Sequence, residues 1–263
     1  MSQIDEFEAH IDLLSEIIGQ AYRLFDRFKI APKSKNKKLF ALITLNEITQ
    51  KCESVVAMAR ADSWAGIVVV TRSAFESYAD LLNCLSLGDD YADYMIWMSL
   101  KQQRSFFQTI GDDPDSKYYQ SIDTHLKTKG GSVKKVIAET NQQLDELAKK
   151  LPDRFKDKNG RVVGRDRLRF EIAGIANEYN TLYRRLSASA HGRLSDMLDG
   201  IMVGDDINWP PAKPTEPPLV AADCLGAILL ESCGRMATAY KKPDAPLKAL
   251  VKKQAGLRRD LYG

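Results

Sequence analysis

The sequence predicts an all-α protein, an antiparallel multi-helix bundle elaborated by long loops, and three observations support this. Apolar residues recur at intervals of three and four through most of the 263 residues, which is the spacing of one helix face. Strand-type alternation is confined to residues 161–163 and 200–203, so at most one short β-hairpin is expected. A composition of 44% apolar and 28% charged residues suits a globular chain with a buried core. We therefore expect a single helical domain over residues 1–263.

Residues 1–151 are expected to form the N-terminal helices of the bundle. The first carries acids in its first turn and basic residues in its last, as the helix dipole favours. The third, which Asp62 or Ser63 would cap, has apolar residues nearly all round and is therefore expected at the centre. The predicted helices span residues 4–28, 36–61, 63–87, 89–110, 117–126 and 132–151.

The chain after residue 151 is less regular. Between residues 152 and 218 the sequence indicates a basic loop, a helix with arginine and histidine, and a loop that holds five of the ten prolines. Residues 219–263 are expected to form the C-terminal helices. The predicted segments are a turn at 159–160, a helix at 167–190, a stiff loop at 197–218, and helices at 219–240 and 246–262.

Charge is nearly balanced over the whole chain. The 38 Lys and Arg against 35 Asp and Glu leave a net charge of +3, too small for a molecule that binds nucleic acid over its whole surface. The excess is local: between Arg154 and Arg193, ten basic residues stand against four acidic ones, a local charge of +6, and the remaining chain carries −3. Such a segment is either a solvated basic loop or a surface that binds phosphates.

The sequence also bears on the compartment. Its N-terminus is acidic and amphipathic, unlike a secretory signal. The longest nearly uncharged run, residues 63–71, is shorter than the roughly 20 apolar residues of a membrane span. The four cysteines are far apart and form no Cys-x-x-Cys pair, so buried free thiols are expected rather than zinc ligands or disulfides. We expect a cytoplasmic protein with no membrane partner.

Several kinds of chemistry lack their sequence motifs. Gly-rich phosphate loops, the Gly-x-Ser-x-Gly elbow and the His-Glu-x-x-His zinc motif are absent. The three histidines lie far apart in the sequence, so no metal site is expected, and no cofactor is indicated either. His10 and His125 are expected on solvated helix faces.

A narrow polar strip runs along the most apolar predicted helix. Arg72 and Glu76 lie one turn apart, and Asn83 falls near the same line at about 100° per residue. The strip is either a structural ion pair at the edge of the core or one wall of a polar cleft.

A second polar strip is predicted between residues 177 and 193. On one helix face lie Asn180, Arg184, Ser187 and His191. A cation, a hydroxyl and an imidazole are thus presented together. His191 lies near the predicted helix end, where the helix dipole favours the protonated imidazole. A histidine that titrates near neutral pH would suit acid–base chemistry.

These residues resemble those of the HEPN superfamily. Both Arg184 and Arg185 fit its Arg-x(4–6)-His pattern with His191. With Arg-x-x-x-Glu at Arg72 and Glu76, and Tyr-x-x-Leu-Ser-x-x-x-His from Tyr183, the chain is similar to a group of HEPN-like bacterial proteins of unknown function. The similarity covers residues 64–85 and 179–193. In the commonest HEPN form a polar residue follows the arginine. Leu186 follows Arg185, whereas Arg184 is followed by Arg185, so which arginine faces the site stays open.

The resemblance implies a HEPN-like helical core, a homodimer, and RNA cleavage without a metal ion. His191 would then be the general acid or base, Arg184 or Arg185 the phosphate clamp, and Arg72 with Glu76 the network that orients them. Further supporting or RNA-binding residues would be Ser187, Tyr183, Asn180, Arg193, Arg165, Arg167 and Arg169. Such a protein would be a toxin or antiphage effector, with a neighbouring antitoxin or defence subunit as partner. The alternative is a non-catalytic helical scaffold or interaction module.

Overall fold

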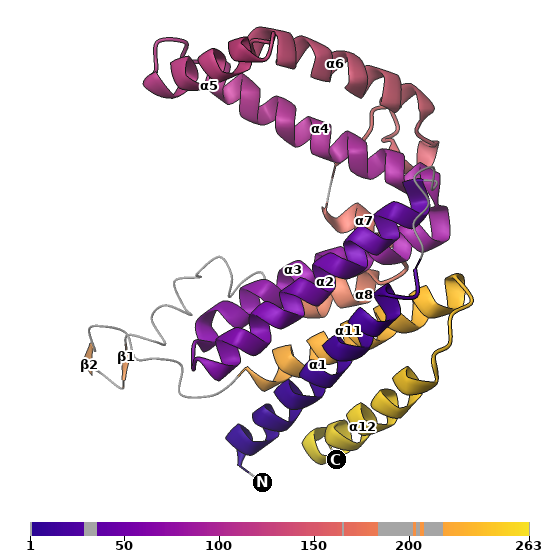
Figure 1. Ribbon diagram of the computed structural model, residues 1–263. Helices are drawn as coiled ribbons and strands as arrows, with labels where there is room; N and C mark the ends of the chain where they lie inside the picture. Colours follow the sequence, from indigo (N-terminus) through magenta and orange to yellow (C-terminus); the bar gives the residue numbers. More distant parts are fainter. Residues whose placement is uncertain are drawn as a thin grey trace. The chain divides into compact units, whose positions relative to one another are not determined.

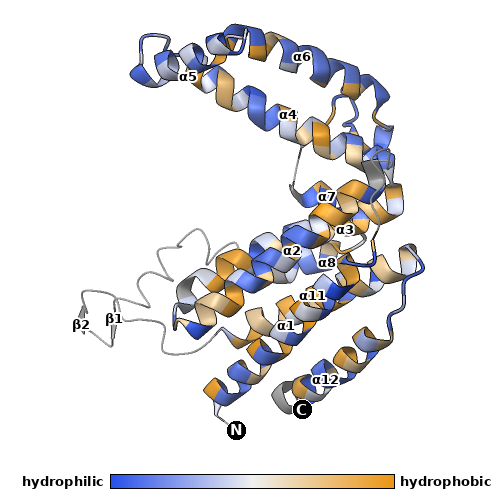
Figure 2. Ribbon diagram, viewed as in Figure 1, coloured by the Kyte–Doolittle hydropathy of each residue, from blue (hydrophilic) through white to orange (hydrophobic). Residues whose placement is uncertain are grey.

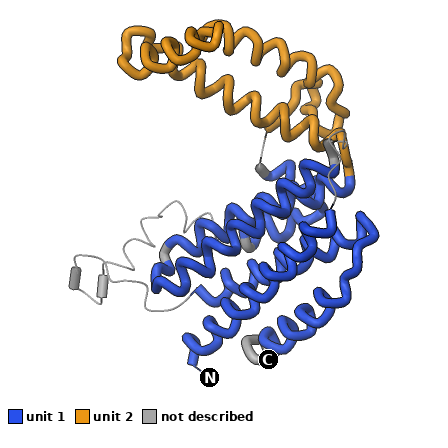
Figure 3. The backbone as a smooth tube through the Cα atoms, in the orientation of Figure 1, with its two compact units in different colours: residues 1–86, 166–263 blue, residues 87–165 orange. Residues whose placement is uncertain are grey.

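The protein is all-α in the part of the chain that the structure describes, apart from one two-stranded hairpin (Figure 1). The computed structural model describes residues 2–28, 36–164, 166–183, 202–203, 206–207 and 218–262. These residues fall into two compact units (Figure 3). Unit 1 combines Met1–Ser86 with Asp166–Gly263, and unit 2 is the intervening segment Leu87–Arg165.

Unit 1 is built around long helices. They are α1 (Gln3–Phe25), α2 (Asn36–Arg60), α3 (Ile67–Leu87), α11 (Leu219–Ala239) and α12 (Ala245–Tyr262). Helix α11 packs against α1, α2 and α12. Hydrophobic residues line α1, α3 and α11 (Figure 2), and their burial forms the core of this unit. These five bundle helices confirm the predicted helical periodicity.

The predicted third helix, 63–87, is wrong at its start. A short 3₁₀ turn, η1 (Trp64–Gly66), precedes α3, and Ser63, one of the two expected caps, makes no side-chain capping hydrogen bond. Asp62, two residues after the end of α2, has φ 50°, in the left-handed region. A Cβ at Gly66 would lie 2.7 Å from the Met58 sulfur, so η1 approaches α2 closely.

The predicted helix over 167–190 is interrupted. Helix α7 spans Asp166–Ile172. Two residues later Gly174 has φ 74°, a left-handed conformation that terminates the helix and that glycine adopts readily. The Ile175 amide donates to the Phe170 carbonyl across this turn. A short α8 (Ala176–Glu178) and a π-helical turn, η3 (Tyr179–Tyr183), follow. The rest of the predicted helix lies outside the described residues.

Unit 2 is a helical hairpin with its own core. Its elements are α4 (Asp89–Gly111), α5 (Lys117–Thr128), α6 (Val133–Lys150) and the 3₁₀ turn η2 (Asp153–Phe155). Helix α4 packs along α6. The hydroxyls of Ser116 and Ser132 cap α5 and α6 by accepting backbone N–H groups. Tyr94 stacks on Phe155, with ring centroids 4.5 Å apart. The turn predicted at 159–160 is present, closed by a β-bridge between Lys156 and Val162.

The two short strands are β1 (Met202–Val203) and β2 (Asp206–Ile207), which pair antiparallel. They agree with the strand signal at 200–203. The proline-rich loop predicted around them lies otherwise outside the described residues. None of the described helices is long and apolar enough to cross a membrane.

Two predictions about single side chains have different outcomes. Cys52, Cys84 and Cys233 are buried and form no disulfide, as expected, whereas Cys224 is only partly buried. The solvated position expected for His10 is wrong: its exposed fraction is 4%, because α11 and α12 cover that face of α1. His125 is exposed, as predicted.

Candidate functional site

The first polar strip is real and lies at the edge of the core. Arg72 and Glu76 on α3 are 3.4 Å apart, from Nη2 to Oε1, and their side chains are 21% and 26% exposed. Helical spacing of four residues places the two groups one above the other. An ion pair of this exposure contacts water on one side and protein on the other.

The protein side of this pair is Tyr183, at the end of η3. Its hydroxyl donates to Glu76 Oε1 over 2.7 Å and accepts from Arg72 Nη2 over 3.0 Å. The Arg72 guanidinium also lies over the tyrosine ring, 5.2 Å from its centroid. Burial raises the pKa of Tyr183, as does its hydrogen bond to Glu76, while Arg72 opposes the rise. Tyr183 is therefore a neutral hydrogen-bonding group at physiological pH.

A second arginine reaches the same carboxylate from α7. Arg169 places Nη1 3.9 Å from Glu76 Oε2 and Nε 3.3 Å from Asp80 Oδ1. The side-chain amide of Asn83 donates to the Arg169 carbonyl over 2.8 Å, which fixes α7 against α3. We call Arg72, Glu76, Asp80, Arg169 and Tyr183 the Arg–Glu–Tyr cluster. Its two guanidinium groups balance its two carboxylates.

Aromatic packing holds the cluster's three elements together. Phe170 of α7 is fully buried, and its ring centroid lies 5.2 Å from that of Phe75 on α3. On its other side Phe170 contacts Tyr179 and Tyr183, at 5.0 and 4.9 Å. This apolar layer beneath the cluster excludes water from one side of Tyr183, and pairs of rings in such offset geometries are favourable.

The structure thus unites four residues that the sequence singled out separately: Arg72, Glu76, Tyr183 and Arg169. Arg169 forms ion pairs with two carboxylates of α3, and its predicted RNA contact stays a prediction. Arg167 is exposed and pairs with Glu171, 2.7 Å from Nε to Oε1. Asn180 is exposed. The remaining predicted site residues lie outside the described part of the chain: Arg165, Arg184, Arg185, Ser187, His191 and Arg193.

Asp80 is the cluster member that sequence reasoning missed. Its position, one turn after Glu76 and still within an apolar helix, was the available signal. Asn83 was placed on the strip, but its contact with the α7 backbone requires tertiary structure. Within the described residues, no group of three or more His, Cys, Asp or Glu side chains is arranged to hold a metal ion.

A family model matches residues 38–208, well over half of the chain. The chain belongs to the family of unknown function DUF5677. Every member of the Arg–Glu–Tyr cluster lies inside the DUF5677 region, whereas α1, α11 and α12 lie outside it. Searches of curated proteins and of solved structures gave no match.

Proposed function

We propose that the protein is a HEPN-like, metal-independent endoribonuclease. The observation that supports this is the Tyr183 hydroxyl, which joins the Arg-x-x-x-Glu motif to the segment that continues directly into Arg184 and, further along, His191. Two motifs separated by 107 residues, Glu76 to Tyr183, meet in one hydrogen-bonded cluster. The HEPN resemblance rests on these same two motifs.

The reaction proposed is attack of a ribose 2′-hydroxyl on the adjacent phosphorus. The bond from O2′ to phosphorus forms and the bond from phosphorus to O5′ breaks, so the products carry a 2′,3′-cyclic phosphate and a 5′-hydroxyl. His191 would take the proton of the 2′-hydroxyl or give one to O5′, and Arg184 or Arg185 would stabilise the charge on phosphorus. Glu76 and Arg72 would orient this machinery through Tyr183.

A comparison of two histidine variants tests the proposal. The wild type, His191→Ala and His125→Ala are induced in bacteria as full-length chains, and total RNA is examined for fragments. We expect fragments with 2′,3′-cyclic phosphate ends from the wild type and from His125→Ala, in which an exposed residue of α5 changes. His191→Ala should leave RNA intact. Purified protein should retain cleavage in a metal chelator.

The proposal fails if the folded wild type leaves RNA intact both in cells and as purified protein, or if His191→Ala cleaves as well as the wild type. Circular dichroism of each variant separates loss of chemistry from loss of fold. Gel filtration of the same samples tests the homodimer that we propose. The role as a toxin or antiphage effector, and an antitoxin or defence subunit as partner, are part of the proposal and are tested by co-expression with neighbouring genes.

Tyr183→Phe tests the positioning role of the cluster. Removing the hydroxyl deletes both of its hydrogen bonds, at a cost of about 1–2 kcal/mol in stability. We expect cleavage to fall by about tenfold or more while the protein stays folded. Tyr118→Phe, which changes a tyrosine that is 60% exposed, is the matched control and should cleave as the wild type does.

The second candidate is a non-catalytic interaction module. It is favoured by the balanced charge of the cluster, in which Arg169 pairs with both Glu76 and Asp80. On this reading the cluster holds α7 and η3 against α3 and performs no chemistry. This second candidate is supported if Tyr183→Phe and His191→Ala lower the stability of the protein while neither the variants nor the wild type cleave RNA.

A further inference from the structure

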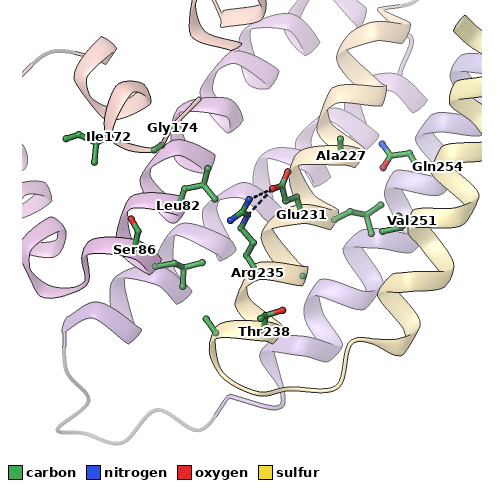
Figure 4. A pocket seen from close by; sticks show the side chains of 15 residues that line it. Leu82, Ser86, Ile172, Gly174, Ala227, Glu231, Arg235, Thr238, Val251 and Gln254 are labelled. Atoms are coloured by element: carbon green, nitrogen blue, oxygen red, sulfur yellow. Dashed lines mark hydrogen bonds and ion pairs between the residues drawn. The ribbon is translucent and has the colours of Figure 1, made fainter. Parts of the chain in front are cut away.

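A groove opens over α11, between α3 and α12, and Ile172 and Gly174 at the end of α7 also line it (Figure 4). None of its described lining residues belongs to the Arg–Glu–Tyr cluster. Its volume is about 860 Å³, within the range of small-molecule sites. Leu82 and Leu85 of α3, Leu230 of α11 and Val251 of α12 give it apolar walls. Val251 is 52% exposed there, an apolar side chain that the fold leaves uncovered. We call this cavity the α11 groove.

One charged pair lies in the α11 groove. Arg235 donates from Nε and Nη2 to Glu231 Oε1, over 2.9 and 2.8 Å (Figure 4). Tyr78 on α3 is buried, and its pKa is raised by burial first and then by its interaction with Glu231, while Arg235 opposes the rise. These contacts use only some of the N–H groups that a guanidinium offers, and the Arg235 side chain is 56% exposed. Among the described lining residues Arg235 is the cation, and it keeps N–H donors that Glu231 does not use.

Gly234 lies next to this pair in the interior of α11. A Cβ at this position would meet no described atom within 4 Å, so no contact in the described part of the fold requires glycine there. Glycine in a helix interior costs about 1 kcal/mol relative to alanine. The missing side chain at Gly234 leaves space in the groove beside Arg235, where the polar end of a ligand would lie.

We propose that the α11 groove binds a small amphipathic organic anion, whose apolar body lies along Leu82, Leu230 and Val251 and whose single anionic group pairs with Arg235. The volume of the groove fits a small organic molecule, and the N–H groups of Arg235 that do not bond to Glu231 favour a ligand with an anionic group. This inference is independent of the proposed ribonuclease activity, since neither Glu231 nor Arg235 belongs to the cluster or to the region that the family model matches.

The probe for the site is anilinonaphthalene sulfonate, which joins an apolar aromatic body to one anionic group and fluoresces when bound. The full chain should bind it with saturable, single-site fluorescence. Gly234→Leu fills the groove from the floor and should weaken binding by about tenfold or more. Gly19→Leu, at a helical glycine of α1 where a Cβ also meets nothing, is the matched control and should bind as the wild type.

The charge preference is tested with a neutral analogue, N-phenylnaphthylamine. Arg235→Gln should weaken binding of the sulfonate by about tenfold and leave the neutral analogue within about twofold. Equal binding by the Gly234→Leu and Gly19→Leu variants would place the dye elsewhere and overturn the proposal. Equal weakening of both dyes by Arg235→Gln would overturn the anion preference. Absence of saturable binding to the wild type would overturn the site itself.

Discussion

The Tyr183 hydroxyl accepts a hydrogen bond from one charged side chain and donates one to another. Arg72 and Glu76 need opposite hydrogen-bonding roles from a partner, and a hydroxyl can serve both at once. A phenylalanine would fill the same volume beside Phe170 but would serve neither. The Tyr183 oxygen therefore supplies hydrogen bonds that no apolar side chain of the same size could replace.

His10 allows a prediction about pH. Burial lowers its pKa below 6.5, and Arg258 adds to this, whereas Asp223 and Glu6 oppose it. The Asp223 carboxylate is nearest, 3.8 Å from Nδ1 to Oδ1. Because the unfolded chain binds the proton more tightly, the stability contributed by neutral His10 is complete above pH 6.5 and falls as the pH drops below it.

The measurement is urea unfolding at a series of pH values between about 7.5 and 5. As the pH is lowered, we expect the free energy of unfolding of the wild type to decrease more steeply than that of His10→Gln. His125→Ala, which removes an exposed histidine, should keep the steep dependence of the wild type. Parallel curves for the wild type and His10→Gln would contradict the assignment.

At the scale of elements, sequence patterns predicted the helices well where the signal was local. The spacing of apolar residues located α1, α5 and α6 to within a few residues. The interruption at Gly174 was missed, although a glycine inside a helical pattern is a warning of a break. Whether such a glycine ends the helix depends on packing, here the burial of Phe170 against α3, which the local pattern does not contain.

Two glycines make this dependence measurable. At both Gly174 and Gly234, an added Cβ meets no atom of the described residues within 4 Å, so we expect substitution by alanine to change mainly the backbone preference. Gly174 has φ 74°, and Gly174→Ala should destabilise the protein by about 1–2 kcal/mol. Gly234→Ala should stabilise it by up to about 1 kcal/mol. Urea unfolding of both variants checks the opposite signs, and shifts in the same direction would refute the explanation.

At the scale of the whole molecule, the chain leaves unit 1 after α3 and returns to it at α7. Periodicity along the sequence reports helices but not which of them share a core, so it could not reveal that residues 87–165 are a separate compact unit. The candidate site was limited in the same way. The spacing of Arg72 and Glu76 could be read from the sequence, whereas the approach of Arg169 and Tyr183 depends on contacts across about 100 residues.

Unit 2 should fold by itself, because its buried residues contact one another within the hairpin. Tyr94 stacks on both Trp97 and Phe155, and its hydroxyl donates to the Val163 carbonyl. We expect a fragment of residues 87–165 to show helical circular dichroism and a cooperative thermal transition. Trp97→Ala should abolish the transition, since loss of a buried tryptophan costs about 3–5 kcal/mol. A gradual, non-cooperative melt of the unsubstituted fragment would contradict this.

Helix α3 contributes to both sites through neighbouring residues. Glu76 belongs to the Arg–Glu–Tyr cluster and Tyr78 lies behind the α11 groove. Two residues along an α-helix correspond to about 200° of rotation, so the two side chains leave α3 in nearly opposite directions. A substitution that moved α3 as a whole would therefore change the surroundings of both Glu76 and Tyr78.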